Sequence, residues 1–258
     1  MNKVWAISDI HLPRSNEQNM DKYGDIWKNH TAVIFDNVLK LCLKNDLILI
    51  PGDISWARNL DEAKESFDYL SRFPCRVVIS TGNHDQWSQA PKDQILKALP
   101  KNVTWINNTC FCIGNIAITA ACLWDFKDIF PWPNHYEMQG NRNKKQKEAL
   151  KEFNTALKLF PENADLIKIL MLHVPPIPYD AKPSFFSNEI TEKCVSYCVF
   201  GHAHNVTEPV PACDAKIDDT HYFLCSCDYL KMMPKEICEF ENDLRPYVID
   251  PNGKMTFL

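Results

Sequence analysis

The chain has 258 residues, of which 45% are hydrophobic, enough for one large α/β domain with a sizeable core. Its formal net charge of −5 argues against tight binding to nucleic acid, which usually requires a basic excess. No apolar run approaches the roughly 18 residues needed to span a bilayer. Because no linker or change of composition divides the chain, we expect residues 1–258 to form a single domain.

Eleven cysteines are scattered along the chain, and several lie inside apolar runs that are typical of strands. The close pairs, such as Cys110 with Cys112, lack the C-x-x-C spacing of many metal and redox sites. Free cysteine packs as a small hydrophobic residue. The N-terminus opens directly into an expected strand, which leaves no room for a cleaved leader. Together these features predict a reducing, cytoplasmic location.

The first half of the chain alternates short apolar runs with helical periodicity. Residues 4–7, 47–50 and 76–80 are predicted strands, and residues 31–44 and 60–73 are predicted helices. Strands that are apolar throughout and alternate with helices indicate a buried sheet with helices packed on it.

The second half is richer in strands. Apolar runs at residues 103–106, 110–113, 116–122, 167–172, 197–200, 222–227 and 247–250 are predicted strands. Residues 144–159 form the longest helical pattern. The basic run at 142–147 leads into that pattern, and we interpret it as a solvated start of the helix.

Five short motifs carry side chains that can bind metals, and several directly follow an apolar run. They are Asp9-Ile10-His11, Gly52-Asp53, Gly82-Asn83-His84-Asp85, the single residue His173, and Gly201-His202-Ala203-His204. Most of these motifs would, by themselves, fit an ordinary loop or a structural histidine. Because sites in α/β sheets form at the carboxyl ends of strands, five such motifs in one chain favour a shared metal centre.

The motif at residues 82–85 offers the most varied chemistry. Asn83 provides a neutral amide oxygen, which is a hard metal ligand. His84 beside it would lie close to a metal and remain free to act on a substrate. Asp85 could hold the other imidazole nitrogen and fix its tautomer.

With these motifs in place, the chain resembles the calcineurin-like metallophosphoesterases. That family carries the series D-x-H, G-D, G-N-H-[DE], H and G-H-x-H, and every element is present between residues 9 and 204. Further stretches resemble a bacterial branch of predicted phosphohydrolases: residues 27–30, residues 52–57, Met171-Leu172-His173 before a double proline, and Cys227-Asp228-Tyr229-Leu230.

The resemblance implies an α/β fold, a four-layer α/β/β/α sandwich with two central mixed β-sheets flanked by helices. It also implies two sets of metal ligands that share Asp53. The first set is Asp9, His11, Asp53 and His204, and the second is Asp53, Asn83, His173 and His202. His84 would protonate the leaving group or stabilise the phosphoryl oxygens, and Asp85 would steer it.

The charge of the ligand set agrees with a phosphate substrate. Two divalent ions would bring four positive charges, of which Asp9 and Asp53 cancel two. The excess suits a bridging hydroxide and an anionic phosphate. Nitrogen and oxygen ligands without thiolate fit Mn, Fe, Zn, Co or Ni better than Ca. We therefore expect a dinuclear hydrolase in which a metal-bridging hydroxide attacks a phosphomonoester or phosphodiester of a small molecule.

The sequence says less about the substrate. The family's protein phosphatases carry Asp-Arg-Gly soon after Gly-Asp, whereas this chain has Ser55-Trp56-Ala57-Arg58-Asn59, which disfavours that class. The same stretch also differs from the cyclic-nucleotide branch. Arg58 could reach a substrate phosphate, although we favour an exposed arginine at a helix start. Trp124 and His135, in the aromatic-rich segment 124–136, could stack a base or an acyl group, although a loop packed on its own domain is favoured.

Three alternatives remain open. A pyrophosphohydrolase acting on a nucleotide-linked lipid precursor would use the same metals, and the aromatic segment permits it. A nuclease would also use them, but the acidic charge argues against duplex binding. A non-catalytic binding scaffold would be expected to lose metal ligands or the histidine that acts as the acid, and this chain retains all of them.

Overall fold

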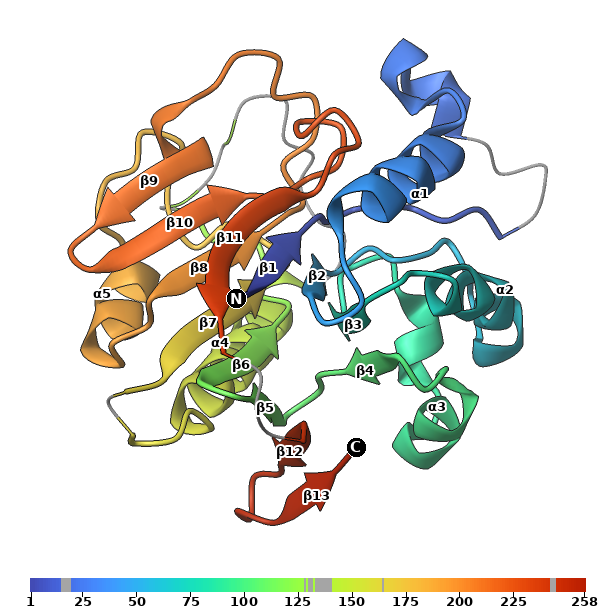
Figure 1. Cartoon of the computed structure of the whole chain (residues 1–258). Helices are drawn as coiled ribbons and strands as arrows, with labels where there is room; N and C mark the ends of the chain where they lie inside the picture. The colour runs from blue at the N-terminus through green and yellow to red at the C-terminus, as the bar shows by residue number, and fades with distance from the viewer. Residues whose placement is uncertain (15–19, 128, 130–131, 133–140, 164, 242–244) are drawn as a thin grey trace.

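Two β-sheets packed face to face form the centre of the molecule, and helices cover the outer face of each sheet (Figure 1). The structure is a computed structural model that describes residues 1–14, 20–127, 129, 132, 141–163, 165–241 and 245–258. The strands and helices counted in the fold are those within these residues. The expected four-layer α/β/β/α arrangement with two mixed sheets is confirmed.

The first sheet has five strands, of which four are parallel and one is antiparallel. Their order is β11 (Lys235–Phe240), β1 (Asn2–Ala6), β2 (Leu47–Pro51), β3 (Arg76–Ser80) and β4 (Val103–Trp105), with β11 antiparallel to β1. The outer face of this sheet belongs to a core shared with α1 (His30–Leu41), α2 (Leu60–Ser71) and α3 (Lys92–Ala98).

The second sheet has eight strands, and its centre is parallel. Their order is β13 (Met255–Phe257), β12 (Tyr247–Ile249), β5 (Cys110–Ile113), β6 (Ile116–Ala121), β7 (Ile167–Leu172), β8 (Tyr197–Phe200), β10 (Thr220–Leu224) and β9 (Asp214–Ile217). Helices α4 (Arg142–Lys158) and α5 (Phe185–Glu192) pack on its outer face. Four short 3-10 helices lie in the described loops: η1 (Met20–Tyr23), η2 (Asp25–Trp27), η3 (Gln86–Gln89) and η4 (Pro211–Cys213).

The alternation of side chains explains why the central strands are apolar throughout. In β2, Ile48 and Ile50 point toward the helices, whereas Leu47 and Leu49 point into the space between the sheets. Successive side chains of a strand point to opposite faces, and in a four-layer sandwich both faces are buried. An uninterrupted apolar run is therefore what this fold requires.

Several elements were not predicted from the sequence. Strand β11 mixes charged and apolar residues at the edge of its sheet, so it lacks the apolar run that marks the central strands. Helices α3 and α5 have only 7 and 8 residues, too few to show a clear helical period. A capping box of Ser184 and Ser187 starts α5 and satisfies backbone N–H groups that have no partner in the first turn of a helix.

The two sheets meet at the edge where the motifs lie. Ser8, just after β1, forms a parallel bridge with Ser226, just after β10. The backbone N–H of Ser8 donates to the carbonyl of Cys225 at 2.7 Å, and the N–H of Cys227 donates to the carbonyl of Ser8 at 2.9 Å. This bridge fixes the carboxyl ends of strands from both sheets next to one another.

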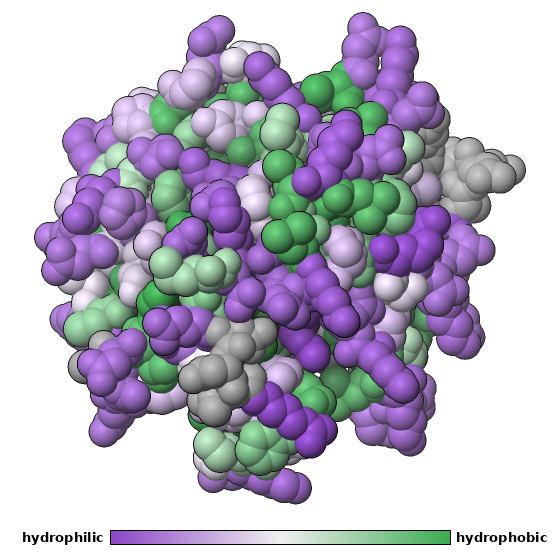
Figure 2. Space-filling view, viewed as in Figure 1, coloured by the Kyte–Doolittle hydropathy of each residue, from purple (hydrophilic) through white to green (hydrophobic). Residues whose placement is uncertain are grey.

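The surface and the cysteines add little information about the class or location of the protein. Hydrophilic side chains cover most of the face drawn in Figure 2, with hydrophobic ones in small groups between them. Within the described residues, no helix combines the length and apolar character that crossing a membrane demands. All eleven cysteines are free thiols. The cytoplasmic location and the single domain stay predictions.

Asp46 gives a test of how the start of the first sheet is held. Its buried carboxylate accepts the backbone N–H groups of Lys3 and Leu43, both at 2.8 Å, and the indole N–H of Trp5 at 3.2 Å. Asp46→Ala leaves these donors without their acceptor, so we expect a loss of about 2–4 kcal/mol in the free energy of unfolding. Urea denaturation measures it. Asp25→Ala, at a side chain that is 93% exposed, is the control, and an equal loss in both variants would contradict the role of Asp46.

Candidate metal centre

The carboxyl ends of five strands deliver the predicted ligands to one place. The strands and the residues that follow them are β1 with Asp9 and His11, β2 with Asp53, β3 with Asn83 and His84, β7 with His173, and β8 with His202 and His204. Three of these strands belong to the first sheet and two to the second. The site therefore lies across the seam between the sheets.

Asp9, His11 and His204 form one group of possible ligands, with one donor atom from each lying within 4.8 Å of the others. The Nε2 of His204 lies 3.5 Å from an Asp9 carboxylate oxygen and 3.3 Å from the Nε2 of His11. These three residues belong to the first predicted ligand set.

Asp9, Asp53 and His173 form a second group at the same spacing. The Nε2 of His173 lies 3.4 Å from an Asp53 oxygen and 2.7 Å from the amide oxygen of Asn83. The imidazole rings of His173 and His202 are 5.0 Å apart. The structure thus brings all four members of the second predicted set together, next to the first.

The donor atoms suit divalent cations. Two imidazole nitrogens only 3.3 Å apart, beside a carboxylate, need a proton or a cation between them. Burial lowers the pKa of His11 to about 3, so this imidazole is neutral, as a metal ligand must be. Two carboxylates, one amide oxygen and four imidazoles form a set that first-row transition metals favour.

The charges of the site depend on two carboxylates that solvent does not reach, Asp9 and Asp53. Burial raises the pKa of Asp9. Burial also acts to raise the pKa of Asp53, but the neighbouring histidines, His173 foremost, together outweigh burial and hold that pKa well below its usual range. Burial acts to lower the pKa values of His173 and His204, but the nearby carboxylates outweigh this effect and raise both values to about 9. A bound cation would take over the positive charge that these protons supply.

Four of the predicted ligands have left-handed backbone conformations that residues other than glycine rarely adopt. The φ angles are 57° at Asp9, 42° at His11, 51° at Asp53 and 67° at His202. Each such residue costs on the order of 1–3 kcal/mol and persists only where the surrounding structure enforces it. The loops that present the ligands therefore hold some of the strained backbone of the chain, which also occurs in loops away from the site, such as at Asn108 and Ala181.

Two glycines of the motifs are required by close packing. A Cβ atom at Gly82 would collide with the backbone nitrogen and the carboxylate of Asp53. At Gly201 it would collide with the side chains of Ser8 and Asp9. The glycines let the loops after β3 and β8 approach the two buried carboxylates directly.

The sequence predicts that Asp85 holds the imidazole of His84. Among the described residues, no hydrogen bond joins these two side chains, so this expected contact is corrected. The carboxylate of Asp85 instead accepts the backbone N–H groups of Ile54, Ser55 and Gly82, and the indole N–H of Trp87. Burial and the nearby charge of Asp53 raise the pKa of Asp85 to about 7. Asp85 thus ties the loop after β2 to the loop after β3.

His84 lies beside the ligand groups without belonging to either of them. Its backbone N–H donates to Asp53 at 2.9 Å. Its ring is 4.5 Å from the ring of Trp56 and 5.7 Å from that of His11. Trp56 also stacks on His11 at 4.8 Å. Sequence reasoning gave Trp56 no role, although it orients both imidazoles.

Asp228 is a functional candidate that sequence reasoning missed. Its carboxylate is 2.9 Å from the Nδ1 of His204 and accepts the backbone N–H of Asn205 at 2.8 Å. A histidine that binds a metal through one ring nitrogen commonly donates a hydrogen bond from the N–H of the other to a carboxylate or carbonyl. This bond aims the first nitrogen at the metal. His173 shows the same arrangement, with Nδ1 3.1 Å from the carbonyl of Pro51. Because Asp228 follows a predicted strand, the strand-end rule that found the other ligands could have found it.

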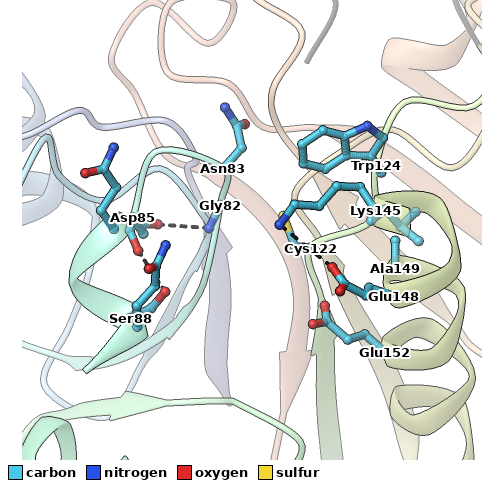
Figure 3. Close-up of a pocket in the computed structure, with 13 residues that line it drawn as sticks. Gly82, Asn83, Asp85, Ser88, Cys122, Trp124, Lys145, Glu148, Ala149 and Glu152 are labelled. Atoms are coloured by element: carbon cyan, nitrogen blue, oxygen red, sulfur yellow. Dashed lines mark hydrogen bonds and ion pairs between the residues drawn. The ribbon is translucent and has the colours of Figure 1, made fainter. Parts of the chain in front are cut away.

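A polar pocket of about 180 Å³ adjoins Asn83 (Figure 3). The loop after β3 forms one wall, and residues after β6 and on α4 form the other. Trp124, predicted to bind substrate, lines this pocket. Arg58 does not line it; its side chain is 61% exposed, and its guanidinium pairs with Glu62 at 3.4 Å. His135 lies outside the described residues, as does much of segment 124–136.

A buried cluster of carboxylate, amide and imidazole donors at the rim of a four-layer sandwich is the arrangement of a metal-dependent phosphoesterase. The model of the calcineurin-like phosphoesterase family matches residues 2–206, and the chain belongs to that family. The protein is therefore a hydrolase that acts on phosphoric ester bonds.

Individual relatives are more distant. A probable cyclic nucleotide phosphodiesterase of Coxiella burnetii (strain RSA 493 / Nine Mile phase I) is 25% identical over 218 residues, which cover 79% of this chain and 76% of that protein.

Two solved structures resemble the chain along most of its length. A protein of unknown function from Aquifex aeolicus covers 92% of this chain, with 96% of its own chain matched, at 14% identity and a TM-score of 0.49. The protein TT1561 of Thermus thermophilus covers 99%, with 97% of its own chain matched, at 12% identity and a TM-score of 0.48. Neither score is high enough to add to the assignment of the fold.

Asp228→Asn tests whether this carboxylate supports the metal centre. Loss of its charge weakens the hold on His204, so we expect the affinity for Mn²⁺ to fall about 10- to 100-fold. Isothermal titration of the metal-free protein measures the affinity without any substrate. Asp219→Asn, on the exposed turn between β9 and β10, should leave the affinity unchanged. Equal affinities in the Asp228 variant and the wild type would refute this role.

Proposed function

We propose that the protein hydrolyses phosphoric esters of small molecules with two divalent transition-metal ions, held by the seven predicted ligands. The observation that carries this proposal is the position of Asp53. One oxygen of its carboxylate lies 3.7 Å from the Nε2 of His11 and 3.4 Å from the Nε2 of His173. It therefore faces one imidazole from each predicted set, as an aspartate shared by two ions would.

When bound, the two ions would activate a water molecule and neutralise the phosphoryl oxygens. The chain's own residues fix the geometry. The N–H of His84 holds the Asp53 carboxylate, and the N–H of His202 contacts both oxygens of Asp9 at 3.1 and 3.0 Å. Both carboxylates, Asp53 and Asp9, are thereby held in place by backbone donors.

His84 is our candidate for the proton donor to the leaving group. Its ring is half-buried next to Trp56, close to the ligand groups and outside both of them. A histidine in this position can deliver a proton to the departing oxygen, an effect typically worth about 10²- to 10⁴-fold in rate. Asp85 acts on this step indirectly, since it fixes the loop that carries His84.

The substrate is a small phosphate ester, and two kinds of support bear on its type. The pocket beside Asn83 is polar and small, which favours a compact leaving group over a lipid chain or a nucleic acid. The name of the Coxiella burnetii relative favours phosphodiesters. Pyrophosphohydrolase and nuclease activities remain alternatives with the same metal chemistry, and a non-catalytic scaffold is the remote one.

A comparison of two chromogenic esters tests the proposed function. We expect the purified protein with Mn²⁺ to hydrolyse p-nitrophenyl phosphate, its bis ester, or both, and to lose that activity with a chelator. Asp53→Asn should abolish turnover and lower the metal content found by elemental analysis. Hydrolysis of the monoester alone would indicate a phosphatase, and hydrolysis of the bis ester a diesterase. Absence of turnover despite two bound ions would reject the proposal and favour the scaffold.

His84→Ala separates proton donation from metal binding. We expect kcat to fall about 10²- to 10⁴-fold while both ions stay bound, because the ring is not one of the predicted ligands. Elemental analysis and steady-state kinetics on the same preparation measure the two effects. A variant that has lost its metal would show that His84 is a ligand and that the assigned role is wrong.

A further inference from the structure

The pocket beside Asn83 connects the metal centre to helix α4. We call it the α4 pocket and define it by Asn83, Gln86, Trp124, Lys145, Glu148 and Glu152 among its lining residues. Figure 3 shows Asn83 and Gly82 on one side, with Trp124 and the α4 side chains Lys145, Glu148 and Glu152 on the other. A substrate whose phosphoryl group contacts ions near Asn83 would project its leaving group between these walls.

The polar walls of the α4 pocket combine donors and acceptors. Lys145 offers three N–H donors, and Glu148 and Glu152 offer only acceptors when ionised. Asn83 and Gln86 carry amides that both donate and accept. Hydroxyl groups likewise donate and accept, so several hydroxyls on one ligand match this mixture better than groups of a single kind.

The charges of the pocket disfavour ionic leaving groups of either sign. Three acidic residues, Asp85, Glu148 and Glu152, line the pocket together with one basic residue, Lys145, and this balance disfavours a second anionic group on the ligand. A cation would compete with Lys145, whose Nζ already lies 3.8 Å from Glu148 and 5.7 Å from the ring centroid of Trp124. Since the side chains of Lys145 and Glu148 are 49% and 48% exposed, their pairing is weak and can yield to a ligand.

The apolar part of the pocket is limited. Trp124 supplies an aromatic ring against which the C–H groups of a sugar or a polyol can pack. The volume of about 180 Å³ is below the range of about 300–1,000 Å³ that is usual for drug-sized ligands. A short polar group therefore suits the pocket better than a nucleobase with its sugar or an acyl chain.

We propose that the α4 pocket selects a neutral, polyhydroxylated leaving group, such as glycerol or a small sugar, and that Lys145 is a specificity-determining residue that contacts its hydroxyls. This inference rests on the proposed phosphoesterase function and names the substrate class of that same site. It also changes the interpretation of the basic run at 142–147, since one of its lysines lines the site.

The test compares two esters that differ in their hydroxyls. With the Mn²⁺-loaded full-length protein, kcat/KM is measured for glycerol 1-phosphate and for propyl phosphate, or for the methyl diesters of the same alcohols if only diesters are hydrolysed. Lys145→Met keeps the length of the side chain and removes its donors. We expect this variant to lose about 3- to 10-fold in kcat/KM for the glycerol ester and to keep its rate on the propyl ester.

The controls separate the possible failures. Lys147→Met changes an exposed lysine of the same helix that does not line the pocket, and it should alter neither ester. Each variant is compared with the wild type on the same ester, so the different leaving ability of the two alcohols cancels. An equal effect of Lys145→Met on both esters, or no effect on either, would overturn the role of the pocket. If the metal-loaded wild type hydrolysed no ester at all, the proposed function itself would fail.

Discussion

The burial of two carboxylates, Asp9 and Asp53, is the constraint on which the rest of the site depends. A carboxylate removed from water must be matched by hydrogen-bond donors and positive charge. Asp9 receives the N–H of His202 and the hydroxyl of Ser226, both from the loops of the opposite sheet. Asp53 receives the N–H of His84 from the neighbouring strand. The contacts that compensate these charges therefore also join the loop after β1 to those after β8 and β10, and the loop after β2 to the one after β3.

The same constraint explains the costly backbone around the site. Left-handed φ angles at four ligands and glycines without room for a Cβ both follow from bringing several loops within contact distance of two carboxylates. The parallel bridge between Ser8 and Ser226 fixes the sheets at this edge and resists relaxation of the loops. Cations bound there would stabilise the folded state, because the ligand cluster exists only when both sheets are in register.

The sequence predicts the central strands and the ligand cluster well, for a physical reason. Buried parallel strands are apolar on both faces, and each ends where a polar motif begins, as between Ile50 and Asp53. Strand β11 and helix α5 escape the pattern because an edge strand and an eight-residue helix need no such run. Adjacency in sequence suggests a bond between Asp85 and His84, whereas in the structure the Asp85 carboxylate accepts backbone N–H groups of the loop after β2. The contact of Asp228 with His204 joins residues that only the fold brings together.

The architecture divides the chemistry from the choice of substrate. The predicted ligands follow strand ends, and four of the seven, Asp9, His11, Asp53 and His173, are buried, so a change there disturbs both metal binding and folding. The α4 pocket is bounded by a loop on one side and by half-exposed side chains of a helix on the other, among them Lys145 and Glu148. Substitutions at such exposed positions usually cost little stability. The pocket walls can therefore change the leaving group that is accepted while the metal centre stays as it is, which is why the substrate could not be inferred from the metal motifs alone.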